Sequence, residues 1–572
     1  MLRLFKLTIV CVLAFGLKTT LIAGQSKAYY LVYWQSSDVR TLQALQLSST
    51  SIHKRQQAQI PFQVNDYGID SKHLEILHQY PWLSIHGHSR WLNASMIICD
   101  SNTYLANLLK HEEILKIDYM GRLAFKQKPN YQAHSIHDSF LYKAHELDAL
   151  KQRYRIQAAG LQTFGANDKA YKVLNTSLNH CFLLNHQAYI AVLDAGFYNA
   201  YQIKGNEDLL INKPFIRDYV DQDGSVWEDD AHGANVLALM KSFDPNHYMG
   251  SSPFAQYALF RTECTSYESP LEAFNWLLAA ETADSLGCDA IVSSLGYNQF
   301  DDKDLGLSYK QLDGHSSLAA FAANTAVNKG ILVIVSAGND GDTKWHYIST
   351  PGDASEAITV GSCSNQFKHS GFSAFGPNAS GQVKPDLLAP GQSIVLSTTW
   401  GYKMGNGTSY ATPILAGLLC NLWQLQKQLS PQEADIKAFK SLVLGTANQW
   451  TNPDSAYGYG IPDISLAEHI IAKEPYAFGL WPNVNGPATQ SLNLHFYALK
   501  QQKLTLRIEL FDKQRKCIKH IQKKINCSKD TWYHFDEAMR VYETAKTKSK
   551  TIDSMTIVIE SEQGSYLRTL DF

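Results

Sequence analysis

The sequence of 572 residues predicts an α/β protein built mainly on a parallel sheet flanked by helices. A small α+β domain is expected before this sheet and an antiparallel β-sandwich after it. Between residues 166 and 474, short apolar runs alternate with amphipathic stretches, the pattern of a parallel sheet covered by helices. After residue 475, apolar and polar residues alternate with period two, which favours antiparallel strands.

Composition narrows the classes of function. Hydrophobic residues make up 45% and charged residues 18%, which is ordinary for globular domains, and the length indicates more than one of them. The net charge of −2 gives no argument for nucleic acid or an anionic membrane as a partner. Neither of these is therefore expected as a partner, and the protein is expected to be a monomer.

The first residues are predicted to be a signal peptide, residues 1–24. Arg3 and Lys6 precede an apolar stretch over residues 7–17 that is too short to span a bilayer, and small residues at Ala23 and Gly24 offer a cleavage site. No other segment is long enough to cross a membrane. This predicts a secreted, cell-surface or periplasmic protein without a transmembrane anchor once the signal peptide is removed.

The nine cysteines fit no disulfide framework. Cys11 lies in the predicted signal peptide and the others are widely scattered. Cys517 and Cys527 either bridge a hairpin or remain thiols, and Cys99, Cys288 and Cys420 have the apolar neighbours of buried thiols. No Cys/His spacing indicates zinc, so no metal site is predicted.

Residues 25–125 are expected to form the small α+β domain. The predicted elements are strands at 28–34 and 91–98 and helices at 40–56 and 102–111. The polar residues 126–165 are predicted to be a linker that holds a processing site and the mature N-terminus.

The alternating region, residues 166–474, contains the strands and helices of the main sheet. Predicted strands are 188–193, 290–292 and 331–335, and predicted helices are 236–240, 271–286, 318–328 and 409–428. Residues 475–572 are predicted to contain strands at 492–496, 504–510 and 556–560.

Four residues of the alternating region supply the groups of a serine hydrolase. Asp194 ends a strand, His232 begins a helix, Asn339 follows a strand, and Ser409 begins a helix that Thr408 is expected to cap. Ser409 would be the nucleophile, His232 its general base, and Asp194 the group that orients the imidazole. Asn339 and the Ser409 backbone N–H would donate to the oxyanion.

Each of these signals is common by itself, but the four together in this order are not. The chain has 20 histidines, and Asp at a strand end or Gly-Thr-Ser at a helix start is often only a cap. An α/β-hydrolase esterase would need Gly-x-Ser-x-Gly and the order Ser, Asp, His, whereas Ser409 comes last. Pro413 is expected near the first turn of the Ser409 helix, where a missing N–H costs little.

The motifs Asp-Ala-Gly at Asp194, His-Gly-Ala-Asn-Val at His232, Ala-Gly-Asn before Asp340 and Gly-Thr-Ser-Tyr-Ala-Thr-Pro around Ser409 resemble those of the subtilisin-like serine peptidases. The resemblance covers residues 163–472 and implies a subtilisin-like fold. It also implies a substrate-binding strand and S1 walls made by Ser294, Leu295, Gly296, Ser336, Ala337 and Gly338.

The departures from this family's usual motifs are Ala195, Ala234 and Asn235. Ala195 removes a hydroxyl that usually supports the catalytic carboxylate, while none of the three removes a group that performs bond chemistry. The chain is therefore interpreted as a secreted endopeptidase acting through an acyl-enzyme. The alternative is a catalytically impaired peptide-binding protein of the same fold.

The resemblance extends to both ends of the chain. Ser-Arg-Trp-Leu-Asn-Ala from Ser89 resembles propeptides of a bacterial branch, which implies an intramolecular inhibitor in a zymogen; a retained binding domain is the alternative. Leu-Trp-Pro-Asn at 480–483 resembles C-terminal sorting domains of the type IX secretion route, with an accessory domain as the alternative. No cofactor is predicted, and a structural calcium, often present in this family, has no located site.

Overall fold

The structure is a computed structural model. It describes residues 27–36, 44–99, 105–122, 166–174, 176, 188–210, 214–228, 230–244, 247–431, 434–473, 477–483, 491–498, 502–512, 514, 516–528, 531–535, 554–561 and 564–571. The predicted signal peptide and most of the predicted linker lie outside these residues. No helix in the described part of the chain is long and apolar enough to cross a membrane.

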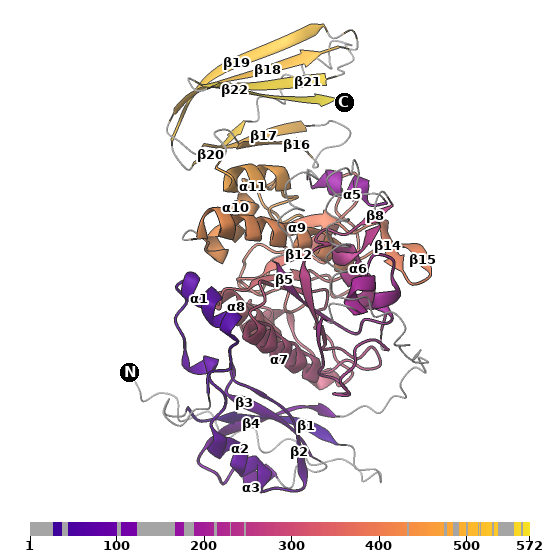
Figure 1. Cartoon of the computed structure of the whole chain (residues 1–572), viewed down its shortest axis with the longest axis vertical. Coiled ribbons are helices and arrows are strands. Elements are labelled where there is room, and N and C mark those ends of the chain that lie inside the picture. Colours follow the sequence, from indigo (N-terminus) through magenta and orange to yellow (C-terminus); the bar gives the residue numbers. More distant parts are fainter. Residues whose placement is uncertain are drawn as a thin grey trace, which may run out of the picture.

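The N-terminal unit, residues 27–122, is an antiparallel sheet of four described strands in the order β2-β3-β1-β4, with helices beside it (Figure 1). The strands are β1 (Ala28–Trp34), β2 (Leu83–Ser89), β3 (Ala94–Cys99) and β4 (Ile114–Arg122). The helices are α1 (Ser49–Gln57), α2 (Ser71–His78) and α3 (Leu105–Leu108), with a 3₁₀ turn at Val64–Asp66.

Strand β1 matches its predicted bounds, whereas three other elements of this unit are shorter than predicted. The strand expected from residue 91 begins at Ala94, because residues 91–93 form a turn in which Asn93 has a φ of 49°. The helix expected at 40–56 begins after Ser48, whose side chain accepts from the N–H of Ser51 and caps it. Of the helix expected at 102–111, the described residues 105–111 are helical only at α3.

The central domain contains a seven-stranded sheet in the order β13-β12-β11-β10-β5-β9-β6 among the described residues. All its pairings are parallel. The strands are β5 (Tyr189–Asp194), β6 (Phe215–Asp218), β9 (Gln256–Arg261), β10 (Ala290–Ser293), β11 (Leu332–Ser336), β12 (Ile358–Cys363) and β13 (Leu387–Pro390).

Helices cover both faces of this sheet, which is why nearly all residues of its strands β5, β10, β11 and β12 are buried. In Figure 1, α7 and α8 lie on the side of the N-terminal unit, and α9 to α11 lie on the other side. The helices are α5 (Asp168–Val173), α6 (His232–Lys241), α7 (Pro270–Leu286), α8 (Leu318–Asn328), α9 (Thr408–Leu429), α10 (Ile436–Gly445) and α11 (Ile464–Ile471). Smaller elements are β7 (Phe243–Asp244), β8 (Tyr248–Met249), β14 (Ile394–Thr398), β15 (Gly401–Gly405) and 3₁₀ turns at Ala200–Gln202, Glu207–Leu210, Lys303–Leu305 and Tyr309–Gln311.

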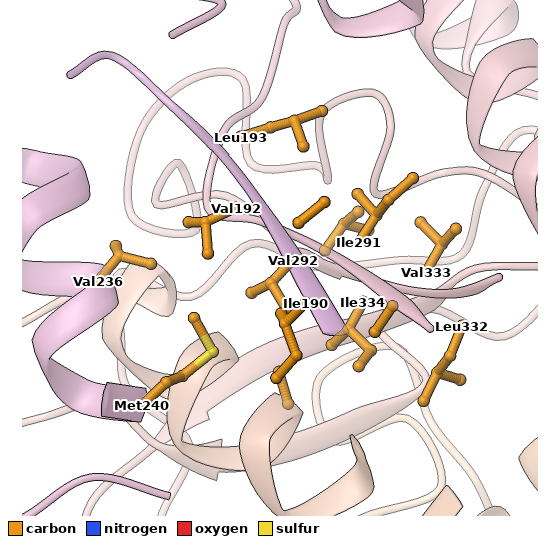
Figure 2. Packing of buried hydrophobic residues seen from close by; sticks show 14 of the residues in the cluster. Ile190, Val192, Leu193, Val236, Met240, Ile291, Val292, Leu332, Val333 and Ile334 are labelled. Atoms are coloured by element: carbon orange, nitrogen blue, oxygen red, sulfur yellow. The ribbon is translucent and has the colours of Figure 1, made fainter. Parts of the chain in front are cut away.

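The core of the central domain lies between β5, β10 and β11 and the helices. Figure 2 shows Val192, Val292 and Ile334 from these strands close to Val236 and Met240 of α6. All of these residues are fully buried. The predicted parallel α/β architecture is confirmed, and the helix expected at 318–328 has the predicted bounds.

The C-terminal unit, residues 477–571, consists of two antiparallel sheets with the strand orders β16-β17-β20 and β19-β18-β21-β22. The strands are β16 (Ala477–Asn483), β17 (Ser491–Ala498), β18 (Gln502–Phe511), β19 (Cys517–Cys527), β20 (Thr531–Phe535), β21 (Ser554–Ser561) and β22 (Gly564–Asp571). Cys517 and Cys527 occupy the two ends of β19, about 30 Å apart at the rise of a strand. Of the two predicted alternatives for these cysteines, the disulfide is therefore wrong, and both are thiols.

Candidate active site

The four candidate catalytic residues lie at the ends of neighbouring elements of the central domain. Asp194 is the last residue of β5, and His232 is the first residue of α6. Asn339 follows the end of β11, and Ser409 is the second residue of α9. The carboxyl ends of parallel strands meet at one edge of a sheet, where ligands of open α/β folds bind.

Asp194 and His232 form a short contact. Nδ1 of His232 lies 2.7 Å from Oδ1 of Asp194, and the same oxygen accepts from the backbone N–H of Ala195 at 2.8 Å. The Asp194 side chain is fully buried, whereas 30% of the His232 side chain is exposed. This contact fixes the orientation of the imidazole and leaves its other nitrogen, Nε2, available for another hydrogen bond.

The pKa of His232 is set by two opposing effects. Burial disfavours the imidazolium and by itself would lower the pKa. The charge and hydrogen bond of the Asp194 carboxylate, together with smaller contributions from Asp230 and Glu263, outweigh burial. The net result is a pKa of His232 above its ordinary value.

The second carboxylate oxygen of Asp194 is unusual. Oδ2 is buried and has no hydrogen-bond partner among the described residues. Ala195 follows directly, at the position where the resembled family usually has a hydroxyl. A buried carboxylate oxygen that accepts no hydrogen bond is energetically unfavourable, so Oδ2 is the atom of Asp194 that the surrounding structure stabilises least.

Ser409 is 8% exposed at the start of α9. Its hydroxyl donates to the backbone carbonyl of Ser294 at 3.3 Å rather than to His232. Catalytic hydrogen bonds in the absence of substrate are often not yet aligned, and a rotation about one side-chain bond would redirect this hydroxyl.

Two expectations about the start of α9 are wrong. Its N-cap is Gly407, with a φ of 156°, rather than Thr408, which is already helical. Pro413 lies beyond the first turn, so it removes the N–H that would bond the carbonyl of Ser409. Oγ of Ser294 donates to that carbonyl at 2.9 Å and replaces the missing bond.

Asn339 is held by the residue that precedes the candidate nucleophile. Its Oδ1 accepts from the backbone N–H of Thr408 at 2.9 Å and from Oγ1 of Thr408 at 3.0 Å. With the oxygen fixed in this way, the Nδ2 group remains as the donor of this side chain.

The two predicted substrate-binding segments lie side by side. Oγ of Ser336 donates to the carbonyl of Leu295 at 3.4 Å. Gly296 is exposed, whereas Ser294, Ser336 and Ala337 are buried. Gly296 and Gly338 pack against the same side chain, since a Cβ at either would approach Oγ of Ser349, to 2.0 Å and 3.1 Å respectively.

Sequence reasoning missed Ser349 and Glu263, which lie in loops far along the chain from the residues they approach. Glu263 follows β9 beside the candidate triad, and its Oε1 accepts from the hydroxyl of Tyr297, next to Gly296. Burial raises the pKa of Glu263 to about 8. No pattern in the sequence marked either residue.

In the described part of the chain, no group of three or more His, Cys, Asp or Glu side chains is placed to hold a metal ion. The calcium that the resemblance implies therefore has no assigned ligands, and the expectation remains untested.

The fold and these side chains define a subtilisin-like serine peptidase domain. Residues 185–460 match the model of the Subtilase family, Peptidase S8, and residues 30–135 match the Peptidase S8 propeptide domain of Bacteroidota. The chain belongs to the subtilase family.

Curated relatives agree with this assignment. The chain is 28% identical over 302 residues to serine protease AprX of Bacillus subtilis, covering 47% of this chain and 64% of the relative. It is 32% identical over 200 residues to the alkaline proteinase of Hapsidospora chrysogena, covering 34% of this chain and 43% of the relative. The matches thus span between two fifths and two thirds of these two proteins.

Among solved structures, the fold is similar to the S393A mutant of the epidermin leader peptide processing serine protease of Staphylococcus aureus. The TM-score is 0.47 at 16% identity, and the match covers 78% of this chain and all of that one.

Proposed function

We propose that this protein is a secreted serine endopeptidase that hydrolyses peptide bonds through an acyl-enzyme. The observation that carries the proposal is the 2.7 Å contact between His232 Nδ1 and Asp194 Oδ1, at the same edge of the sheet as the start of α9, which bears Ser409. A carboxylate, an imidazole and a hydroxyl in this chain order and at these element ends are the groups that peptide hydrolysis needs.

In the proposed reaction, Nε2 of His232 takes the proton of Ser409 as its oxygen attacks the substrate carbonyl carbon. Asp194 stabilises the imidazolium that forms. The imidazolium then gives its proton to the leaving amine, which leaves an ester on Ser409 that water hydrolyses by the same route. Before attack, the Ser409 hydroxyl turns away from the carbonyl of Ser294.

The negative oxygen of the tetrahedral intermediate is proposed to accept from Nδ2 of Asn339 and from the backbone N–H of Ser409. The fixed Oδ1 of Asn339 supports this role, because it pre-orients the amide before substrate binds. The start of α9 adds unpaired amides and the positive end of the helix dipole.

Substrates are proposed to be extended protein or peptide segments. Ser294, Leu295 and Gly296 would pair with the peptide backbone, and Ser336, Ala337 and Gly338 would form the opposite wall of the S1 pocket. The Ser294 side chain is already bonded to the carbonyl of Ser409, so only its backbone is available to a substrate.

The N-terminal unit is proposed to inhibit the enzyme before maturation. Its propeptide-domain match and its packing against α7 support this role. The predicted signal peptide supports export, and the predicted linker is the proposed place of the maturation cut. Calcium, if bound, would have a structural role.

Turnover of a protein substrate by purified protein and its variants tests the proposal. We expect Ser409→Ala and His232→Gln to remove nearly all turnover, while Asn339→Ala lowers kcat by about 10²–10³ with little change in KM. Folded wild-type protein without turnover, even after residues 1–125 are removed, would instead favour the impaired peptide-binding protein.

A further inference from the structure

A two-stranded hairpin of the central domain directly precedes the start of α9. It consists of β14 and β15, joined by a turn at residues 399–400, and β15 ends at Gly405, shortly before Ser409. In Figure 1 the hairpin lies at the rim of the central domain beside α6, which β14 contacts. The hairpin is therefore placed to meet a substrate that binds at the candidate active site.

Large apolar side chains of this hairpin face solvent. Trp400, in the turn, is 91% exposed, and Tyr402 and Met404 of β15 are 50% and 61% exposed. Side chains two residues apart on a strand share a face, so Tyr402 and Met404 lie on the same face. Lys403 is the only charged residue between residues 399 and 406. Single exposed apolar residues are common, but three together beside a candidate active site indicate a surface that binds another chain.

Tyr402 is held in place from within the domain. Its ring stacks on the ring of Tyr248, with the centroids 5.8 Å apart and the planes 20° apart. Its hydroxyl donates to Oδ2 of Asp244 at 3.2 Å, and Nζ of Lys204 lies 2.8 Å from the same oxygen. Because Tyr402 is already fixed while half of it is exposed, little conformational entropy is lost when a partner covers it.

The two edges of the hairpin differ. The outer edge of β14 is occupied by Asn167, whose Oδ1 accepts from the N–H of Val395 at 3.0 Å and whose Nδ2 donates to the carbonyl of Val395 at 2.9 Å. Among the described strands, β15 pairs only with β14, so its other edge has no strand partner. An open edge can accept an extended segment as an additional strand, with side chains that recur at every second residue.

The hairpin lies on the side of the candidate site where the leaving peptide departs. His232 is proposed to give a proton to the leaving amine, so the residues after the scissile bond pass this imidazole. The ring centroid of Tyr410 lies 6.2 Å from that of His232, and a Cβ at Gly405 would lie 2.7 Å from Cε2 of Tyr410. The end of β15 therefore reaches the His232 side of Ser409.

We propose that this hairpin, residues 394–405, binds the segment of a protein substrate that follows the scissile bond and selects apolar residues in it. The open edge of β15 pairs with the main chain of this segment. Trp400, Tyr402 and Met404 cover its apolar side chains at alternate positions. The inference rests on the proposed endopeptidase function, because it assigns a substrate preference to the same site.

Binding is tested without catalysis, on the full chain with Ser409→Ala. Two fluorescein-labelled octapeptides with free amino termini represent the leaving segment: one alternates Ser with Leu or Phe, and the other has Ser throughout. Fluorescence polarisation should give a dissociation constant about 10-fold or more lower for the apolar peptide. The hairpin variant, Trp400→Ser with Met404→Ser, should remove this difference. Leu429→Ser, which changes a 54% exposed leucine at the end of α9, should retain it.

Turnover by the purified wild-type protein tests which side of the scissile bond the hairpin contacts. Internally quenched substrates are built around a bond that the protein cleaves, with alternating Leu and Phe either after or before this bond. The ratio of kcat/KM between the first and the second substrate should fall about 10-fold in the hairpin variant, through KM rather than kcat. The ratio should keep its wild-type value in Leu429→Ser. Thermal unfolding checks that both variants fold.

The proposal is overturned if the two octapeptides bind equally, or if the folded hairpin variant binds the apolar one as tightly as Leu429→Ser does. An unchanged kcat/KM ratio also overturns it. Two other occupants of this surface would do the same: vesicles of phosphatidylcholine and phosphatidylglycerol bound through Trp400 in place of the peptide, or a dimer that the hairpin variant converts to a monomer in size-exclusion chromatography. If the octapeptide binds through the hairpin but the wild-type protein has no turnover, the endopeptidase function fails and the binding surface stands.

Discussion

His232 has a raised pKa because burial, the largest single effect, is outweighed by the charge and hydrogen bond of Asp194 together with the charges of Asp230 and Glu263. As a general base it must be neutral, so we expect kcat/KM to fall as pH decreases through a pKa above the ordinary 6.5. Asp194→Asn should lower this pKa and reduce kcat by about 10⁴, since the imidazole loses its orientation. Asp230→Asn is the control, because Asp230 contributes charge without the 2.7 Å contact.

A pH profile of peptide hydrolysis measures both the pKa of His232 and the maximal kcat. In Asp230→Asn, the loss of activity at acidic pH should move to lower pH, and the maximal activity should be unchanged. An Asp194→Asn enzyme with the parent plateau would contradict the role assigned to the carboxylate.

The unpartnered Oδ2 of Asp194 leads to a second expectation at this scale. Ala195→Ser supplies a hydroxyl next to the carboxylate, and a charge-assisted hydrogen bond contributes about 1.5–3 kcal/mol. We expect kcat to increase several-fold with little change in KM. Ala195→Gly, which changes size but adds no donor, should not raise kcat, and a lower kcat in Ala195→Ser would show that the oxygen needs no donor.

At the residue scale, the sequence identified groups whose motifs are local and missed groups that meet only through the fold. Asp194, His232, Asn339 and Ser409 each lie within a short motif at an element end. Ser349 and Glu263 approach the site from loops whose sequence carries no periodicity or motif, so only the fold reveals them.

At the scale of elements, helix α9 depends on Ser294 because Pro413 cannot donate to the carbonyl of Ser409. Ser294→Ala should lower the free energy of unfolding by about 1–3 kcal/mol. Adding Pro413→Ala restores an N–H for the same carbonyl, so the double variant should regain part of the loss, as measured by urea unfolding.

Ser251→Ala is the matched control for this pair of substitutions. Oγ of Ser251 donates to the carbonyl of Pro413 at 2.8 Å, and Pro413→Ala adds no donor for that carbonyl. Strictly additive effects of Ser294→Ala and Pro413→Ala would contradict the exchange of donors.

The loop after β9 contains the buried Glu263, whose pKa burial raises to about 8 from 4.5. The folded protein then keeps a proton that the unfolded chain loses, so stability should fall as pH rises between these values, by up to about 1.4 kcal/mol per pH unit. Glu263→Gln should reduce this slope in urea unfolding, while the neighbouring Glu268 and Glu272, whose pKa values are also raised, continue to contribute to it. The exposed Glu75→Gln should leave the slope as it is. An unchanged slope in Glu263→Gln would assign it to another group.

Element bounds were predictable where apolar periodicity extends over the whole element, as in α8 and β1. They were not predictable in the N-terminal unit at β2, where Leu83–Ser89 contains two histidines and is mostly half-buried. There the strand is specified by its pairing with β3 and its packing on α7, neither of which is local.

At the scale of the whole molecule, the N-terminal unit shares a core with the central domain. Tyr29, Leu31 and Met96 pack into the central core, while Tyr30 and Val32 of β1 face a separate core of their own unit. Among the residues whose burial the structure describes, the buried members of the central core extend no further than Ile471. The order of the three parts was predictable, whereas the shared core was not.

Two truncations test the shared core. Removal of residues 475–572 should leave the main thermal transition within a few degrees of the full chain, since all described members of the central core are retained. Removal of residues 25–122 exposes an apolar face and should lower the transition or the soluble yield markedly. Equal effects of the two truncations would contradict the shared core.

Labelling by a fluorophosphonate, followed by mass spectrometry of the peptides, tests the central claim most directly. The account predicts one adduct on Ser409, absent from Ser409→Ala and strongly reduced in His232→Gln, once the N-terminal unit is removed or released. An adduct on another serine, or folded protein with no adduct at all, would contradict the assignment of Ser409 as an activated nucleophile.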